Sequence, residues 1–213
     1  MHILPSPEIL LAFTAASLLL ILTPGPDMTL MVGQTLQSGR ARGFAALAGA
    51  TTGLMLHSLL VAFGLSALLV ASATAFTVVK VAGVGYLLWL AYQALRHGTA
   101  LSVSHKKRKP QPLGQVYLMG LTVNLLNPKI VMFFLTFLPQ FVSVSDPHAA
   151  AKLFFFGVYF TVLGAPTCAV LVLLADRFTA ALQRSPRAMR VFDWLFAGLM
   201  GAFAARLLVA RGN

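Results

Sequence analysis

The chain has 213 residues, of which 58% are hydrophobic and only 10% charged, with 16 lysines and arginines against 5 acidic residues. Soluble domains carry about 25% charged residues, so this composition excludes a water-soluble globule and predicts one integral membrane domain over residues 1–213. The net charge of +11 does not indicate a nucleic-acid partner, because the basic residues cluster between long uncharged stretches and form no continuous stripe.

The first half of the chain predicts three membrane-spanning helices. A helix needs about 20 apolar residues to cross a bilayer. Residues 9–39 carry a single charge, Asp27, and predict the first helix. Residues 43–79 carry none but are too long for one crossing, so we divide them near 71–74. This division predicts a second helix over about 43–70 and a third over about 74–95.

The second half predicts three more. Residues 110–145 carry only Lys129 and form the fourth helix, and the uncharged residues 153–175 form the fifth. The sixth, over about 189–210, has the weakest pattern because it contains Asp193 and Arg206. The predicted fold is therefore an all-α membrane protein with six transmembrane helices.

The loop charges predict an orientation. Alternate loops hold 11 of the 16 basic residues, with the densest run at Lys106-Lys107-Arg108-Lys109. The positive-inside rule places these loops in the cytoplasm and both termini outside. The basic run is also suited to anionic lipid headgroups. No lysine or arginine precedes the first apolar stretch, which continues past the length of a signal peptide's core, so we expect the first helix to be retained.

Two predicted helices contain helix-breaking motifs near their middle. The first contains Pro24-Gly25-Pro26, and the fourth contains Asn127-Pro128. Proline removes a backbone donor and leaves the carbonyl four residues earlier without its helical hydrogen bond. Within a membrane, such a carbonyl is found only where it is buried in protein or lines a water-filled cavity. Pro26 suits the first position of a new half-helix, and Asn127 suits the cap before Pro128. Both helices are therefore predicted to break here.

The two motifs predict an internal repeat. Pro24 and Pro128 stand half a chain apart, and each half holds three predicted helices. An odd number of crossings forces the second half to enter the membrane in the opposite direction. We therefore expect two inverted three-helix repeats, over about 1–98 and 114–213, joined by a basic cytoplasmic loop at about 96–113. In such repeats the matching broken helices form a site near the membrane midplane.

Three charged residues within the apolar stretches are candidates for this site: Asp27, Lys80 and Lys129. Mid-membrane charges are costly and should be paired or hydrated. We expect Asp27 and Lys129 to face each other across a pathway, where they would bind a zwitterionic amino acid and where Asp27 would carry a proton. The alternatives are a helix-dipole role for Asp27 and a structural ion pair for Lys129. Lys80 suits either the pathway or a snorkelling position.

Polar and small residues around the breaks have open alternatives too. Asn124 can serve the pathway or an interhelical hydrogen bond. His57 can move protons or pack through a hydrogen bond. Gly49 and Gly53 form a small-residue pair that suits close helix packing within the protomer or a homodimer interface.

The chain resembles the lysine exporter and homoserine/threonine resistance (LysE/RhtB) family of bacterial amino-acid efflux carriers. The resemblance covers essentially the whole chain and is strongest in the first and fourth predicted helices, at Thr23-Pro24-Gly25-Pro26 and at Asn124-Leu125 with Asn127-Pro128-Lys129. Further matches are Gly39, Arg40, Gly43, Gly49, Gly53, His57, Gly64, Lys80, Gly83, Tyr86-Leu87, Gly120, Phe133-Phe134 and Pro139-Gln140-Phe141. One departure is Ala91, where the family often has glycine.

The resemblance implies export of an amino acid or close derivative across the inner membrane, driven by the proton gradient. Other classes fit less well. An intramembrane enzyme needs a nucleophile–base set, a metal cluster or a carboxylate pair, and the sequence indicates none of these. A membrane electron carrier needs a cysteine pair, whereas the chain has one cysteine, Cys168. A cation carrier needs more ligands than Asp27 and His57. We therefore expect no cofactor, no metal and no nucleotide drive.

Overall fold

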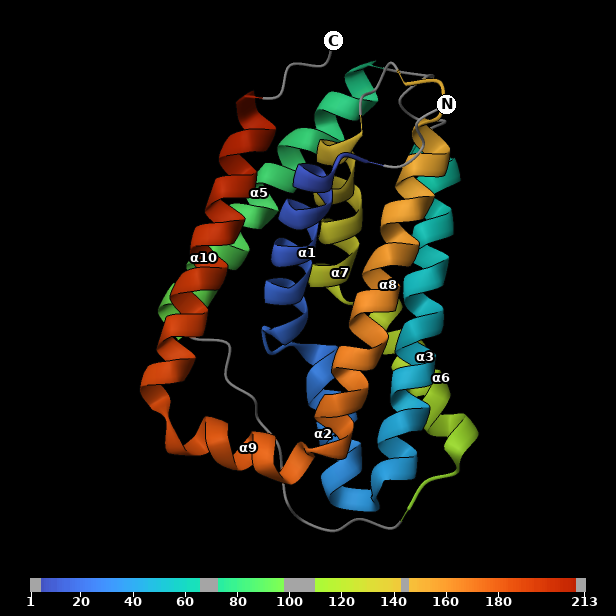
Figure 1. Ribbon diagram of the computed structural model, residues 1–213, viewed down its shortest axis with the longest axis vertical. Coiled ribbons are helices and arrows are strands. Elements are labelled where there is room, and N and C mark those ends of the chain that lie inside the picture. The colour runs from blue at the N-terminus through green and yellow to red at the C-terminus, as the bar shows by residue number, and fades with distance from the viewer. Residues whose placement is uncertain (1–4, 66–72, 98–109, 143–145, 210–213) are drawn as a thin grey trace.

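The computed structural model describes residues 5–65, 73–97, 110–142 and 146–209, which form an elongated bundle of helices without a strand (Figure 1). The helices of the first half are α1 (Pro7–Leu22), α2 (Pro26–Ser38), α3 (Arg40–Leu59) and α5 (Ala73–His97). A π-helical segment, η1 (Leu60–Leu65), extends α3. The basic run within the predicted 96–113 loop lies outside the described residues.

The second half begins with α6 (Leu113–Leu125) and a short α7 (Pro128–Met132). The chain continues from α7 through a π-helical segment, η2 (Phe133–Phe137), and a 3-10 turn, η3 (Leu138–Phe141). Three helices complete the fold: α8 (Ala149–Leu173), α9 (Ala175–Arg184) and α10 (Pro186–Val209).

Both predicted helix breaks are present. The axes of α1 and α2 differ by 51°, and those of α6 and the α7–η3 segment by 47°. Pro26 and Pro128 each occupy the first position of the following half-helix, where a missing N–H costs nothing. Asn127 caps α7 as expected, because its side-chain oxygen accepts a hydrogen bond from the Lys129 backbone N–H at 3.0 Å.

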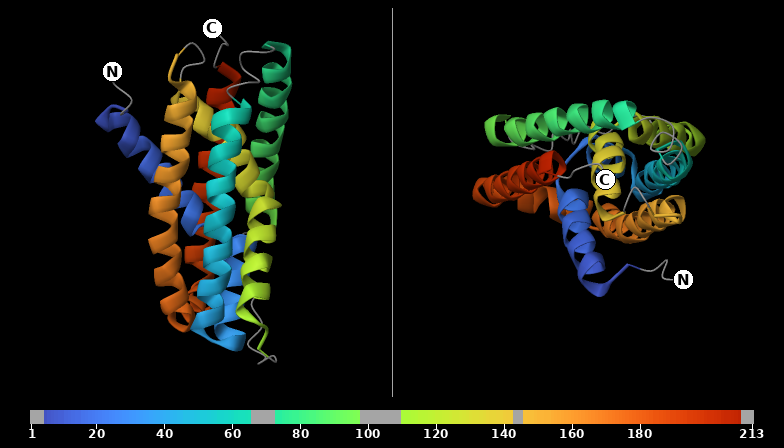
Figure 2. Two further views of the ribbon diagram at one scale, coloured as in Figure 1. Left: turned by 90° about the vertical axis from the view of Figure 1, so that its right-hand side faces the viewer. Right: turned by 90° about the horizontal axis from the view of Figure 1, so that it is seen from above.

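Within the described ranges, two helical segments have the length and composition to cross a membrane alone, Arg40–Gly64 and Ala149–Leu173. The bent pairs α1–α2 and α6 to η3 add two more candidates if each pair is counted as one span. Consecutive long segments run in alternate directions along the bundle, and the α1–α2 pair runs opposite to the α6–α7 pair (Figures 1 and 2). The start of α1 and the end of α10 lie at the same end (Figure 1).

One element was not expected from the sequence. The predicted fifth helix ends at residue 175 and the sixth begins at about 189, but the residues that follow the fifth form α9 (Ala175–Arg184), which lies across the end of the bundle (Figure 1). Ala175 and Thr179 are buried on one side of α9, whereas Asp176 and Arg177 are exposed. This division of apolar and charged faces suits a helix lying along an interface rather than crossing it.

Backbone contact between α3 and α6 joins the two halves of the chain. An added Cβ on Gly49 would lie 2.0 Å from the backbone oxygen of Tyr117, and one on Gly120 would lie 2.1 Å from that of Ala46. An added Cβ on Gly53 would also collide with α6, at the side chain of Asn124. The Gly49–Gly53 pair therefore serves packing within the protomer, and these two glycines are not available for the alternative of a homodimer interface.

Aromatic side chains fill the bundle where α1 meets the α7–η3 segment and α8. Phe13 and Phe156 are fully buried with ring centroids 4.7 Å apart, and Phe133 lies 4.4 Å from Phe160. Ring contacts at this spacing contribute about 0.5–1.5 kcal/mol each beyond burial. Phe13 of α1 also lies 6.1 Å from Phe133 and 5.7 Å from Phe137 of η2, measured between ring centroids, so this cluster packs α1 against η2 and α8.

Candidate functional site

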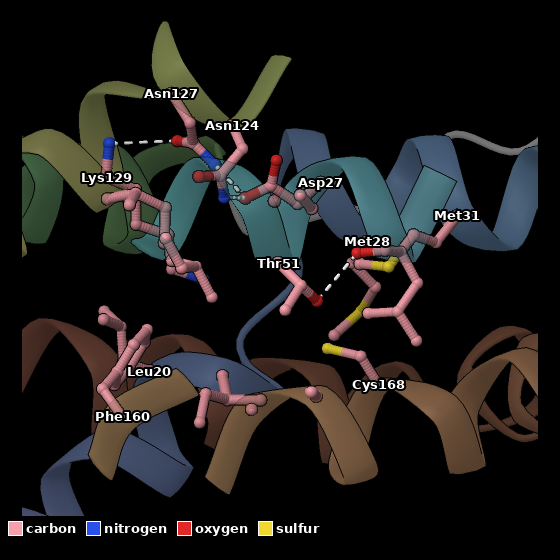
Figure 3. Close-up of a pocket in the computed structure, with 18 of the residues that line it drawn as sticks. Leu20, Asp27, Met28, Met31, Thr51, Asn124, Asn127, Lys129, Phe160 and Cys168 are labelled. Carbon is pink, nitrogen blue, oxygen red and sulfur yellow. Dashed lines mark hydrogen bonds between the residues drawn. The ribbon is translucent and has the colours of Figure 1, made fainter. Parts of the chain in front are cut away.

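A cavity lies where the two helix breaks meet (Figure 3). Its empty volume is about 560 Å³, a figure that includes the open mouth. The breaks contribute the polar part of the lining, and α2, α3 and α8 contribute a mainly apolar part. The lining consists of Leu20, Ile21, Thr23, Gly25, Asp27, Met28, Met31, Leu47, Ala50, Thr51, Leu54, Asn124, Asn127, Lys129, Ile130, Phe160, Gly164, Ala165 and Cys168.

Asp27 stands in the first turn of α2 and points toward the second break. Its Oδ2 accepts hydrogen bonds from the side-chain amides of Asn124 and Asn127, each at 2.9 Å. Its Oδ1 is buried and has no hydrogen-bond partner among the described residues. A carboxylate oxygen without a partner beside a cavity is available to a ligand that donates hydrogen bonds.

Lys129 stands in the first turn of α7 and reaches back to the first break. Its Nζ donates a hydrogen bond of 2.7 Å to the backbone oxygen of Thr23, the residue that ends α1. Its Nζ also lies 6.0 Å from the ring centroid of Phe196 in α10. An ammonium has three donors, so two of them remain for other partners.

Asp27 and Lys129 line the same cavity but form no direct ion pair; each bonds to other groups. The arrangement is reciprocal, since the charged residue of each break bonds to the other break. Pro24 and Pro26 remove the helical donors for the carbonyls of Leu20 and Leu22, whereas Lys129 bonds to the carbonyl of Thr23.

Small residues make room for these contacts. An added Cβ on Gly25 would lie 3.6 Å from both Cδ and Nζ of Lys129, so the lysine stem passes directly over the first break. An added Cβ on Gly53 would lie 2.5 Å from Asn124 Oδ1. Pro24 is buried between α1 and α2, whereas Pro26 and Pro128 are exposed at the starts of their half-helices.

His57 lies behind Asn124. It is buried against Phe134, at 5.4 Å between ring centroids, and its Nε2 lies 3.4 Å from the Asn124 backbone oxygen. This geometry is that of a long hydrogen bond donated by the ring to the carbonyl that Pro128 deprives of its helical donor. The Asn127 backbone N–H also donates to this carbonyl, at 3.1 Å.

The remaining candidate, Lys80, belongs to α5, but its side chain lies outside the described part of the structure. Most of the other lining residues, including Thr51, Phe160 and Cys168, were not among the sequence candidates. In the sequence these residues stand within apolar stretches, and such a stretch does not show which face of its helix lines a cavity. Within the described residues, no three histidine, cysteine or acidic side chains gather closely enough to hold a metal ion.

The geometry fits a small molecule that carries both charges. Asp27 Oδ1 can accept from an ammonium, and Lys129 can donate to a carboxylate, at one cavity bounded by two broken helices. Discontinuous helices that meet at a polar site are the structural basis of many membrane carriers. The fold and site therefore define a helical membrane protein of the transporter class.

Comparison with known families identifies the group. A family model described as "LysE type translocator" matches residues 18–211, and the chain belongs to this family. The membership agrees with the resemblance found in the sequence and indicates a transporter rather than an enzyme.

Characterised and uncharacterised relatives match over nearly their full length. The chain is 32% identical over 200 residues to a homoserine/homoserine lactone efflux protein of Salmonella typhimurium (strain LT2), covering 94% of this chain and 96% of that one. A protein with the same description from Salmonella typhi is 32% identical over 206 residues, with the same coverage. An uncharacterized membrane protein of Vibrio cholerae is 30% identical over 210 residues, covering 94% and 97%. No solved structure matches the chain.

Proposed function

We propose that the protein is an inner-membrane carrier that exports a small neutral amino acid or a close derivative, such as homoserine, in exchange for protons. The main support is that Asp27 and Lys129 line one shared cavity, where each forms a hydrogen bond to the opposite helix break. The efflux proteins that share 32% identity over nearly the full length support this substrate class.

The proposed binding mode places the two charges of a zwitterion at the two breaks. The substrate ammonium bonds to Asp27 Oδ1, which has no hydrogen-bond partner in the described part of the chain. The substrate carboxylate bonds to the two remaining donors of Lys129. One acid and one lysine balance one zwitterion, so a neutral side chain leaves no uncompensated charge in the membrane interior.

The proposed coupling follows from the limited capacity of Asp27. A proton and a substrate ammonium compete for its Oδ1, so the carrier binds one or the other. Competition for one group, combined with access from alternate sides, produces exchange of substrate for protons. In this proposal Asn124, Asn127 and the prolines hold the Asp27 carboxylate in place. His57 belongs to the proposed pathway because it contacts the Asn124 carbonyl. Lys80 stays a sequence-based prediction.

The proposed topology has six crossings and two inverted repeats. Helices α5 and α10 have 25 and 24 residues, about 37 Å at 1.5 Å per residue, enough for a core of about 30 Å. They pack against each other, and the two bent pairs run in opposite directions. The positive-inside rule then places the end with α9 and Arg40 in the cytoplasm and both termini outside. Lipid surrounds the bundle, and a homodimer would use a face other than Gly49 and Gly53.

Transport by purified protein tests the function. Proteoliposomes loaded with radiolabelled homoserine are diluted into buffers with and without a pH gradient. We expect release that is faster when the outside is acidic and that slows when a protonophore collapses the gradient. Release at equal rates under all three conditions would contradict proton exchange. Absence of release above that of empty-vector membranes, with homoserine and with other neutral amino acids, would contradict the whole proposal.

A further inference from the structure

The part of the cavity away from the breaks has little polarity. It is formed mainly by apolar side chains of α2, α3 and α8, and its polar side-chain groups are the hydroxyl of Thr51 and the thiol of Cys168. Figure 3 shows Thr51 reaching from α3 into the space that faces Met28 and Cys168. Any side chain of a substrate held at Asp27 and Lys129 must enter this space or the open mouth.

The Thr51 hydroxyl can act as an acceptor there. Its own proton is already used, since Oγ1 donates a hydrogen bond of 2.9 Å to the backbone oxygen of Leu47 one turn earlier. A hydroxyl has one donor and two acceptor lone pairs, so Oγ1 retains lone pairs for a donor in the cavity. The Cys168 thiol is only a weak donor and acceptor.

We propose that Thr51 is a specificity-determining residue that accepts a hydrogen bond from a hydroxyl group on the substrate side chain. This inference rests on the proposed function and assigns the residue that recognises the hydroxyl of a short, uncharged side chain such as that of homoserine. An additional ammonium or carboxylate in this space would be buried without a partner of opposite charge, which is strongly unfavourable.

The neighbouring residue supplies a matched control. Thr52 lies on the same helix, but its hydroxyl donates to the Ala48 carbonyl and accepts a hydrogen bond of 2.9 Å from the Tyr117 hydroxyl. Thr52 does not line the cavity. Replacing either threonine by valine removes one hydroxyl from α3 at nearly constant shape, but only the change at Thr51 alters the cavity.

The test measures selectivity between homoserine and norvaline, in which a methyl group replaces the hydroxyl. Wild-type protein, Thr51→Val, Thr51→Ser and Thr52→Val are compared in proteoliposomes by the ratio of initial efflux rates at limiting substrate. We expect Thr51→Val to lower the homoserine-to-norvaline ratio by about two- to tenfold, the effect of one neutral hydrogen bond. Norvaline efflux above that of protein-free liposomes would show that the Thr51→Val protein folds and transports, so the ratio reports selectivity.

The controls separate the possible outcomes. Thr51→Ser retains the hydroxyl and should keep the wild-type ratio, as should Thr52→Val. A ratio unchanged by Thr51→Val, or lowered equally by Thr52→Val, would overturn the role of Thr51 while leaving the proposed transport function intact. Absence of efflux of both amino acids by the wild-type protein would instead overturn the proposed function.

Discussion

Replacing Asp27 by asparagine isolates the charge at the site. In the structure, Asp27 Oδ2 accepts two amide hydrogen bonds at 2.9 Å, whereas Oδ1 has no partner among the described residues. An asparagine can place its side-chain oxygen at the Oδ2 position and its amide at the Oδ1 position. Both bonds from Asn124 and Asn127 are then retained, so we expect the Asp27→Asn protein to fold.

The expected loss is in substrate binding and coupling. A hydrogen bond to a charged group contributes about 1.5–3 kcal/mol, and a neutral one about 0.5–1.5 kcal/mol. The difference, about 1–1.5 kcal/mol, corresponds to about five- to tenfold weaker binding of the substrate ammonium. The asparagine amide also donates at the position where an acceptor is needed, so the loss should reach at least this magnitude. Because asparagine does not titrate, proton-driven acceleration should disappear.

Two assays measure these effects. Equilibrium binding of radiolabelled homoserine to purified protein gives the change in Kd, and proteoliposome efflux with and without a pH gradient gives the coupling. The Asn127→Asp variant is an informative companion, since it keeps a cap for α7 but places a second acid beside Asp27. Full proton-dependent efflux by Asp27→Asn, with unchanged Kd, would refute the assignment of Asp27 as the coupling group.

Three further predictions concern other parts of the molecule. Lys129→Met keeps the aliphatic stem but removes the ammonium that bonds to Thr23 and, in the proposed mode, to the substrate carboxylate. Because a hydrogen bond between charged groups is lost, homoserine binding should weaken by about tenfold or more. An unchanged Kd would contradict the proposed carboxylate site. Gly49→Ala places a Cβ 2.0 Å from a backbone oxygen of α6 and should destabilise the protein by about 1–3 kcal/mol, measured by thermal unfolding in detergent. Gly64→Ala, with nothing within 4 Å of the new Cβ, is the control and should differ little; equal melting temperatures for both variants would contradict the close packing. Outside the spans, hydrogen bonds from the Lys152 side chain and the His148 backbone N–H lower the pKa of Asp146. The stabilising effect of these bonds is therefore present above about pH 4, the pKa in the unfolded chain. It is lost as the pH falls through the lower folded pKa. A carboxyl titration by NMR that gives a pKa of about 4 or higher would exclude this contact.

The helix breaks were predictable because their cause is local. Proline at 24, 26 and 128 removes backbone donors whatever the surroundings are, and Asn127 has the chemistry of a cap. The structure has both breaks at these positions and has Asn127 bonded to the Lys129 N–H. The family resemblance was also visible in the sequence, because it depends on ordered motifs rather than on three-dimensional contacts.

The contacts between the breaks were not predictable in detail. The sequence predicts that Asp27 and Lys129 face each other across a pathway, and both line one cavity. It does not predict their partners, because side-chain reach and rotamers decide that Lys129 bonds to the Thr23 carbonyl and Asp27 to two asparagines. The sequence does not predict which helix packs against Gly49 and Gly53 either, because small residues permit close approach by any helix. Helix α9 was missed because ten residues with several charges do not match a spanning pattern.

The backbone contact of α3 with α6 constrains how this carrier can change shape. Helices that touch through Gly49 and Gly120 without intervening side chains cannot slide or roll past each other without steric collision. This contact therefore holds α3 and α6 together across the two halves of the chain, beside the second break. In the proposed transport cycle we expect α1 and the α7–η3 segment to move about Pro24-Gly25-Pro26 and Asn127-Pro128 while α3 and α6 stay in contact.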